Sequence, residues 1–275
     1  MKSQVIFINI FTQLVYFIGV VFAVGVLMYL LHKAFYKMIG NKRWVCYATG
    51  FIGTPIHELS HALMCIVFFH KIKEIKFFQA DSKSGTMGYV THSHNPKNIY
   101  QVTGNYFIGT APLFVGTAII FLMIKFIFPN VSTEILRCFD DVAVVQAEGV
   151  SLELLIIYGQ AIWKMFCSVI SAFQSGIEWI LFVFIALCIS IHMKLSGADI
   201  KNSLKSLPVL VGMIALFNLT LGFLMYENYL TIVRTINLFC GYFSSILLLS
   251  LVLSLLGVIL SFFVWIVKII VKRIF

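Results

Sequence analysis

The stretch VIFINIFTQLVYFIGVVFAVGVLMYLL, residues 5–31, runs for 27 residues without one charged side chain. An α-helix rises about 1.5 Å per residue, so about 20 such residues cross the hydrocarbon core of a bilayer. The rest of the chain has the same character: of its 275 residues, 60% are hydrophobic and 11% are charged, whereas about 25% are charged in a soluble domain. The sequence therefore predicts a membrane protein, and we interpret its first apolar run as a retained span rather than a cleaved signal peptide.

We predict an all-α polytopic membrane protein that forms one transmembrane domain over residues 1–275, with about six transmembrane helices. The predicted spans are residues 5–31, 45–69, 104–128, 177–195, 207–227 and 238–270. Residues 70–95 alternate apolar and polar side chains on both sides of a turn-like DSKSGTMG, which predicts a β-hairpin or small sheet. Residues 151–176 carry a polar stripe at helical spacing, which predicts an amphipathic helix at the membrane interface.

The basic charge indicates an orientation in the membrane. The net charge of +9 is spread over loops and chain ends without a dense basic block, which argues against nucleic acid as a partner. Twelve of the twenty Lys and Arg residues fall on the side of the two termini, although the cluster Lys33, Lys37, Lys42 and Arg43 lies opposite. Cytoplasmic loops carry the excess of Lys and Arg, so we expect both termini in the cytoplasm, in a bacterial plasma membrane.

The motif HELSH, residues 57–61, lies inside the second predicted span. Positions i and i+4 share one face of a helix, so His57 and His61 can direct two imidazoles at one metal ion. Glu58 stands beside the first ligand, where its carboxylate can deprotonate a water activated by zinc. Ionisable residues in a membrane span are costly, which favours a function for all three over a structural polar patch. We predict one Zn²⁺ per chain, with Glu58 as the general base.

A catalytic zinc site needs a third protein ligand. Asp199 is the candidate: spans two and four run in the same direction, so the end of span four lies towards the same leaflet as HELSH. Asp199 is about a turn too far along, so the fourth span either extends past Ser196 or breaks at Gly197. His192, seven residues earlier on the same helical face, is the alternative metal ligand or a residue that supports one. For His92 and His94 we expect a role in an edge strand or loop.

The six cysteines show no CxxC spacing, and most of them lie in apolar segments. We expect them to be small core residues rather than members of a disulfide or zinc framework.

These residues resemble the site-2 protease family of intramembrane zinc metalloproteases. HELSH in a span is followed by a β-rich loop, by GNYFIGTAPLFVG (residues 104–116) entering the next span, and by an aspartate after a further span. The resemblance covers roughly residues 45–205. It implies that His57, His61 and Asp199 bind zinc, that Glu58 is the general base, and that the β-rich loop holds an extended substrate by strand addition. The active site would lie towards the cytoplasmic leaflet.

The predicted activity is hydrolysis of a peptide bond in or near a transmembrane segment, so the expected partners are the lipid bilayer and a membrane-anchored protein or peptide substrate. Two other functions remain open at this point. The chain could be a zinc hydrolase of another membrane-associated substrate, or a polytopic transporter in which the His, Glu and Asp side chains move ions. The hydrolases require bound zinc and a base, whereas the transporter requires ion flux that depends on these residues.

Overall fold

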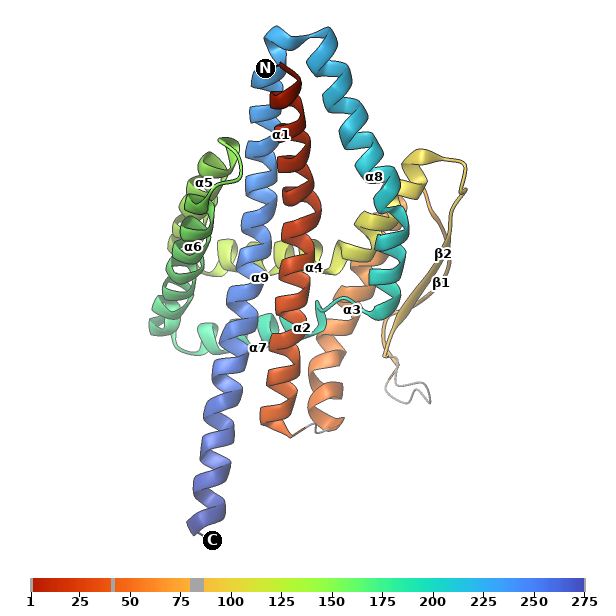
Figure 1. Ribbon diagram of the computed structural model, residues 1–275. Helices are drawn as coiled ribbons and strands as arrows, with labels where there is room; N and C mark the ends of the chain where they lie inside the picture. Colours follow the sequence, from red (N-terminus) through yellow and green to blue (C-terminus); the bar gives the residue numbers. More distant parts are fainter. Residues whose placement is uncertain (1, 41–42, 80–86, 275) are drawn as a thin grey trace.

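A computed structural model of the chain describes residues 2–40, 43–79 and 87–274 (Figure 1). Most of these residues are helical. The elements in chain order are α1 (Lys2–Leu14), a π-helical turn η1 (Val15–Gly19), α2 (Val20–Ile39), α3 (Arg43–Val67), β1 (Lys71–Lys76), β2 (Tyr89–Ser93), α4 (Ile99–Ile127), α5 (Pro129–Ala147), α6 (Leu152–Ser171), a 3-10 turn η2 (Ala172–Ser175), α7 (Ile177–His192), α8 (Gly197–Leu224) and α9 (Tyr226–Ile274).

Two long rods run through the molecule in the same direction. The first is the continuous stretch from α1 to α2, and the second is α9, which packs along α2 (Figure 1). Helices α4 and α7 cross these rods, with the α5–α6 pair on one flank and the β-hairpin with α8 on the other. The main core lies where the crossing helices meet the rods, and it includes the fully buried Leu113, Ile135 and Leu247. This arrangement buries the middle of α4 and the end of α7, which both contact α3.

The membrane character is supported, whereas the number of spans stays a prediction. Within the part of the chain that the structure describes, five helical stretches are long and apolar enough to cross a bilayer: Lys2–Ile39, Ile99–Ile127, Leu152–Ser175, Gly197–Leu224 and Tyr226–Val271. Helix α3, which covers the second predicted span, is not among these five, and α7 is a shorter apolar helix of 16 residues. At 1.5 Å per residue, α7 is about 24 Å long, less than the hydrocarbon thickness of about 30 Å.

Two predicted boundaries change in the structure. The fourth predicted span, 177–195, ends at His192, and a new helix begins at Gly197 instead of residue 207. The break therefore comes before Gly197, and Asp199 lies in the first turn of α8 rather than at the end of α7. Residues 151–176 are predicted to form an interfacial helix. The observed helical stretch Leu152–Ser175 is long and apolar enough to span, so the interfacial location stays a prediction.

The β-hairpin is present as predicted. Strands β1 and β2 pair antiparallel, with Lys71 opposite Ser93 and Lys76 opposite Tyr89. Residues 81–86, which form most of the predicted turn DSKSGTMG, lie outside the described residues. The six cysteines are free, and four of them are buried, as expected of core residues.

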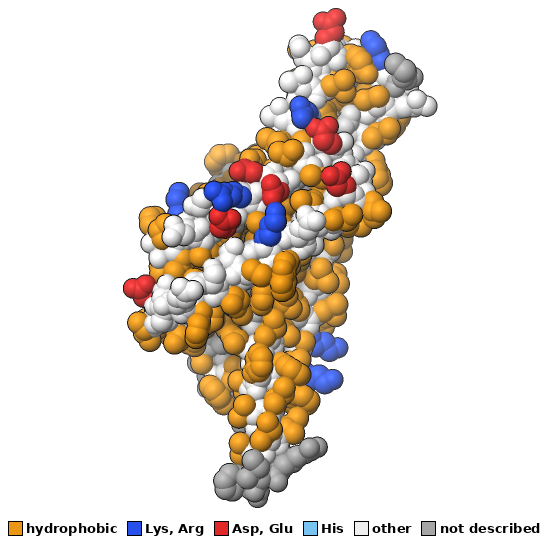
Figure 2. Space-filling model, turned by 90° about the vertical axis from the view of Figure 1, so that its left-hand side faces the viewer, with side chains coloured by type: hydrophobic (Ala, Val, Ile, Leu, Met, Phe, Trp, Pro, Cys, Tyr) orange, Lys and Arg blue, Asp and Glu red, His pale blue; other side chains and the backbone are white. Residues whose placement is uncertain are grey.

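Charged side chains gather on the upper part of the face formed by α5 and α6 (Figure 2). Three exposed ion pairs belong to this region: Arg137 with Glu134, Lys164 with Asp141, and Arg234 with Glu148. Lys164 belongs to the polar stripe of α6, so this stripe faces α5 and the surface. Exposed pairs of this kind contribute about 0–1 kcal/mol each, so they mark a polar surface rather than a source of stability.

Candidate metal centre

Helix α3 brings the two histidines of HELSH together on one face, as their spacing predicts. Nε2 of His57 lies 3.1 Å from Nε2 of His61. His61 is 7% exposed, and Glu58 between them is 6% exposed. The polar face of α3 therefore points into the protein, where α4, α7 and β2 pack against it.

Asp199 completes the cluster from α8. Its Oδ1 lies 3.4 Å from Nε2 of His61, and its Oδ2 lies 3.8 Å from Nε2 of His57. A capping box fixes this carboxylate: the Ser196 hydroxyl accepts a hydrogen bond from the Asp199 N–H at 3.2 Å, and Asp199 Oδ2 accepts one from the Ser196 N–H at 2.7 Å. The start of α8 thus aims Asp199 at the two imidazoles.

Main-chain carbonyls orient both imidazoles. Nδ1 of His57 lies 2.7 Å from the carbonyl oxygen of His192, and Nδ1 of His61 lies 2.7 Å from that of Ile108. His192 is the last residue of α7, and the last four carbonyls of a helix have no partner within it. The carbonyl of Ile108 would normally accept from residue 112, which is Pro112 and has no N–H. Both carbonyls are therefore free to accept from a histidine.

The hydrogen bonds determine which nitrogen of each ring can bind a metal. A carbonyl oxygen only accepts, so each Nδ1 must carry the proton, and the Nε2 of a neutral ring then presents a lone pair. Two such lone pairs and a carboxylate face one another at 3.1–3.8 Å. Zinc–ligand bonds of about 2.0–2.2 Å in a tetrahedron place the ligand atoms about 3.4 Å apart. The donor set and its spacing fit one zinc ion.

Two cavities meet at this cluster. One of about 220 Å³ is lined by all three candidate ligands together with Glu58 and residues of β2. The other, of about 410 Å³, is lined by His57, Glu58, His192 and Lys194 among others. Glu58 lines both cavities. It follows His57 in the chain and lies beside the position where the side chains of the three candidate ligands converge. This is the place of a base that acts on water or substrate without being a metal ligand.

The β-hairpin closes over the cluster. A Cβ built on Gly88 would lie 2.7 Å from Cγ2 of Thr54 and 2.8 Å from Cγ of Glu58, so the chain just before β2 touches α3 at the HELSH motif. Tyr89, Val90 and His92 of β2 line the smaller cavity. Since β1 pairs with only one side of β2 among the described residues, β2 brings a strand edge to the cavity.

The hairpin side chains beside the cavity have shifted pKa values. The Tyr89 hydroxyl donates to Oε1 of Glu74 at 2.6 Å, and this bond raises the pKa of Tyr89. Burial lowers the pKa of His92 to about 4, helped by the neighbouring His70 and His94. His92 is therefore neutral at pH 7 and keeps a lone pair.

The structure brings His57, Glu58, His61 and Asp199 together. The imidazole of His192 is not part of this cluster: its Nδ1 lies 3.0 Å from the Cys188 carbonyl, and His192 supports His57 through its main-chain carbonyl. The sequence reasoning missed the carbonyls of Ile108 and His192. A proline four residues after position 108 and a helix end at position 192 are the signals that could have identified them.

Comparison of the chain with protein-family models, curated proteins and solved structures finds no match in any of the three.

Proposed function

We propose that this chain is an intramembrane zinc metalloprotease that hydrolyses a peptide bond in or near a transmembrane segment of a membrane-anchored substrate. The observation that carries the proposal is the meeting of two oriented Nε2 lone pairs and the Asp199 carboxylate at 3.1–3.8 Å, with Glu58 beside them. The resemblance of the motifs to the site-2 protease family points the same way. His57, His61 and Asp199 would hold the zinc.

Bound zinc supplies Lewis acidity, which lowers the pKa of water and polarises a peptide carbonyl. Glu58 accepts a proton from the attacking water as its oxygen bonds to the carbonyl carbon. Glu58 then delivers this proton to the amide nitrogen as the C–N bond breaks, which gives an amine and a carboxylic acid, and the acid releases the second water proton to solvent as it becomes a carboxylate. The carbonyls of Ile108 and His192 keep the two imidazoles in the required tautomer.

The hairpin supports a substrate in extended form. A peptide bond inside a helix is shielded by its own hydrogen bonds, so a transmembrane substrate must unwind before cleavage. The edge of β2 beside the 220 Å³ cavity offers main-chain groups to an extended segment, which is a common way to bind peptides. The bias of Lys and Arg supports a site towards the cytoplasmic leaflet.

The test uses the full chain reconstituted in liposomes with labelled single-span peptides that carry Gly or Pro near one membrane boundary, together with an unlabelled peptide for mass spectrometry. We expect cleavage by the wild type loaded with zinc, and none by Glu58→Gln at equal zinc content. Zinc binding without cleavage of any peptide in the panel would count against the protease.

The same liposomes separate the protease from the transporter. A transporter would carry protons or zinc across the bilayer, and this flux would depend on His57 and Asp199. Flux without hydrolysis would therefore reject our proposal. Hydrolysis of a lipid-linked substrate but not of peptides would instead indicate a zinc hydrolase of another class.

A further inference from the structure

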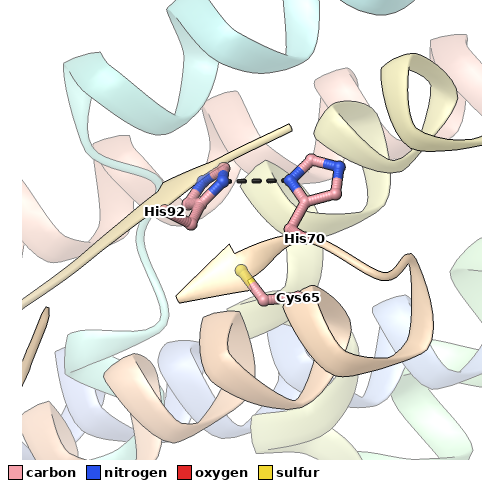
Figure 3. Close-up of side chains that lie close together, drawn as sticks. All are labelled: Cys65, His70 and His92. Atoms are coloured by element: carbon pink, nitrogen blue, oxygen red, sulfur yellow. Dashed lines mark hydrogen bonds between the residues drawn. The ribbon is translucent and has the colours of Figure 1, made fainter. Parts of the chain in front are cut away.

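A second cluster of metal-ligating side chains lies at the far end of α3. Cys65, in the last turn of this helix, lies close to His70 before β1 and His92 of β2, and Figure 3 shows the three side chains together. One ligand atom from each residue lies within 4.8 Å of the other two. Cys65 and His70 are buried, at 0% and 6% exposed. None of the three belongs to the His57, His61 and Asp199 cluster.

The chain turns sharply to place His70 over Cys65. Phe69 has φ of 54°, in the left-handed region that non-glycine residues seldom adopt. The His70 N–H donates to the carbonyl of Cys65 at 2.8 Å, which closes the turn after α3. The backbone therefore holds the thiol and the first imidazole on the same side of the helix end, facing β2.

The hydrogen bond of His70 to α4 leaves its Nδ1 without a proton. Its Nε2 lies 2.7 Å from the carbonyl of Gln101 in α4, so Nε2 carries the proton and Nδ1 presents a lone pair. This lone pair accepts a hydrogen bond from Nδ1 of His92 at 3.0 Å, so a metal bound between the two rings would take the place of that proton, which would move to Nε2 of His92. A carbonyl on the opposite nitrogen is the usual support of a metal-binding histidine. His61 has the same relationship to α4 through Ile108.

The donor set and its surroundings satisfy the requirements of a metal site. Zinc–nitrogen bonds of about 2.0–2.1 Å and a zinc–sulfur bond of about 2.3 Å place the ligand atoms of a tetrahedron roughly 3.3–3.7 Å apart. To reach this geometry, the two Nδ1 atoms at 3.0 Å would separate by a few tenths of an ångström, and the sulfur, within 4.8 Å of the nitrogens, would approach by up to about 1.2 Å. His92 also lines the 220 Å³ cavity, which gives an ion an entry path and a water as fourth ligand.

We propose that Cys65, His70 and His92 form a second metal site, which binds zinc through one thiolate and two imidazoles. One sulfur and two nitrogen ligands suit zinc better than the oxygen-preferring magnesium or calcium. The thiol of Cys65 loses its proton to solvent when the metal binds. The bound ion ties β2 to the end of α3 and thereby fixes the hairpin over the first cluster. This site goes beyond the proposed protease activity and does not depend on it.

The expected roles of two residues change accordingly. Cys65 was expected to be a core cysteine, and its burial agrees with that, but its sulfur also faces two histidines. His92 was expected to serve in an edge strand, and it does lie in β2, with its ring turned towards His70. The thiol and the two imidazoles come from a helix end, a turn and a strand.

Metal counting on the full chain tests the proposal. The protein is purified in detergent with a reducing agent, stripped with a chelator, loaded with zinc and analysed by mass spectrometry of the metal. We expect two zinc ions per wild-type chain, one in His57→Ala/His61→Ala, and one in Cys65→Ala/His92→Ala. Cys138→Ala, which removes another buried cysteine, keeps two. A wild-type content of one ion that disappears in His57→Ala/His61→Ala would overturn the second site.

Cobalt distinguishes the two sites directly, since only the second contains sulfur. The wild type loaded with Co²⁺ should show a thiolate-to-cobalt charge-transfer band in the near ultraviolet. The band should persist in His57→Ala/His61→Ala and Cys138→Ala, and disappear in Cys65→Ala. Its absence from the wild type overturns the proposal without relying on any variant that could misfold. Because the band does not require peptide cleavage, the second site and the protease activity can fail separately.

Discussion

The carbonyl oxygen of Ile108 lies 2.7 Å from Nδ1 of His61, and Pro112 leaves that oxygen without its usual partner in α4. A proline inside a helix usually appears as a defect in packing or hydrogen bonding. Here the lost hydrogen bond orients a candidate metal ligand from another helix. Position 112 therefore acts on the metal centre through a main-chain atom four residues away.

Replacing Pro112 with alanine should separate metal affinity from fold stability. Alanine restores an N–H that competes with His61 for the Ile108 carbonyl, so zinc affinity should fall about 10–100-fold, as it does when the outer support of a ligand is lost. The helix itself should become no less stable, because proline is the poorest helix former. Zinc titration and thermal unfolding of the zinc-free protein measure the two effects. Pro208→Ala in α8 is the matched control, with unchanged zinc affinity.

Glu58→Gln should keep the metal and lose the reaction. The amide has the shape of the carboxylate but cannot accept the proton of water, and the loss of a general base typically costs about 10²–10⁴-fold in rate. Zinc content and cleavage of the reconstituted peptides are measured on the same sample. Glu153→Gln, an exposed glutamate of α6, serves as the control. Equal cleavage by both variants would remove Glu58 from the mechanism.

Asp199→Ala and His192→Ala should differ in zinc content. Asp199 contributes a carboxylate to the cluster, so its loss should reduce bound zinc well below one ion per first site. His192 contributes its main-chain carbonyl to His57, and alanine retains that carbonyl, so His192→Ala should bind zinc normally. Both variants are measured by metal analysis in the Cys65→Ala background, which isolates the first site. The opposite result would make His192 the third ligand.

Gly53→Ala should disturb the metal centre from the same face of α3 that carries His57 and His61, one turn before His57. A Cβ at this position would clash with the Cys188 carbonyl and lie 2.7 Å from Nδ1 of His192, so α7 must move. We expect a loss of about 1–3 kcal/mol in unfolding free energy, typical of overpacking, together with weaker zinc binding. Gly159→Ala in α6 is the control, because no atom lies within 4 Å of the new Cβ. Its zinc affinity should be unchanged, and its unfolding free energy should stay the same or rise by up to about 1 kcal/mol. Unfolding in denaturant and zinc titration provide the measurements.

The hairpin should respond to alkaline pH through Tyr89. The hydrogen bond to Glu74 raises the pKa of Tyr89 above its ordinary value of 10.0. The stability from this bond is fully present below the ordinary pKa and is lost as the pH rises through the raised one. Carbon-13 NMR of labelled tyrosines should show Tyr89 ionising late, and nearer to its ordinary pKa in Glu74→Gln. Tyr89→Phe identifies the signal, and an unchanged titration in Glu74→Gln would contradict the assignment to this bond.

The spacing of residues along the chain is enough to predict those parts of the site that lie within a single helix or strand. Residues four apart share a helical face, so the meeting of His57 and His61 could be predicted, and alternation predicted the two strands. Asp199 could be proposed from the direction of successive spans and from the family resemblance. The structure brings it to the cluster differently, through a helix break and a capping box at Ser196.

The sequence could not predict how α4 and α7 pack against their neighbours, and the reason is physical. Helices that are apolar on every side give no signal of which face meets which neighbour. The carbonyls of Ile108 and His192 depend on that packing, and so does the approach of His92 to Cys65 across three elements. Cysteine and histidine spacing along the chain reveals a metal site only when the ligands come from one or two elements.

The two main-chain oxygens have a consequence for how this sequence can drift in evolution. Any residue other than proline at 108 or 192 can present the same carbonyl, so the side chains at these positions can be exchanged without moving His57 or His61. Pro112 acts on His61 only by leaving the Ile108 carbonyl free, because proline alone among the amino acids lacks the competing N–H. In distant relatives, a lost isoleucine at 108 would be compatible with a working centre, and a lost proline at 112 would be the change to look for first.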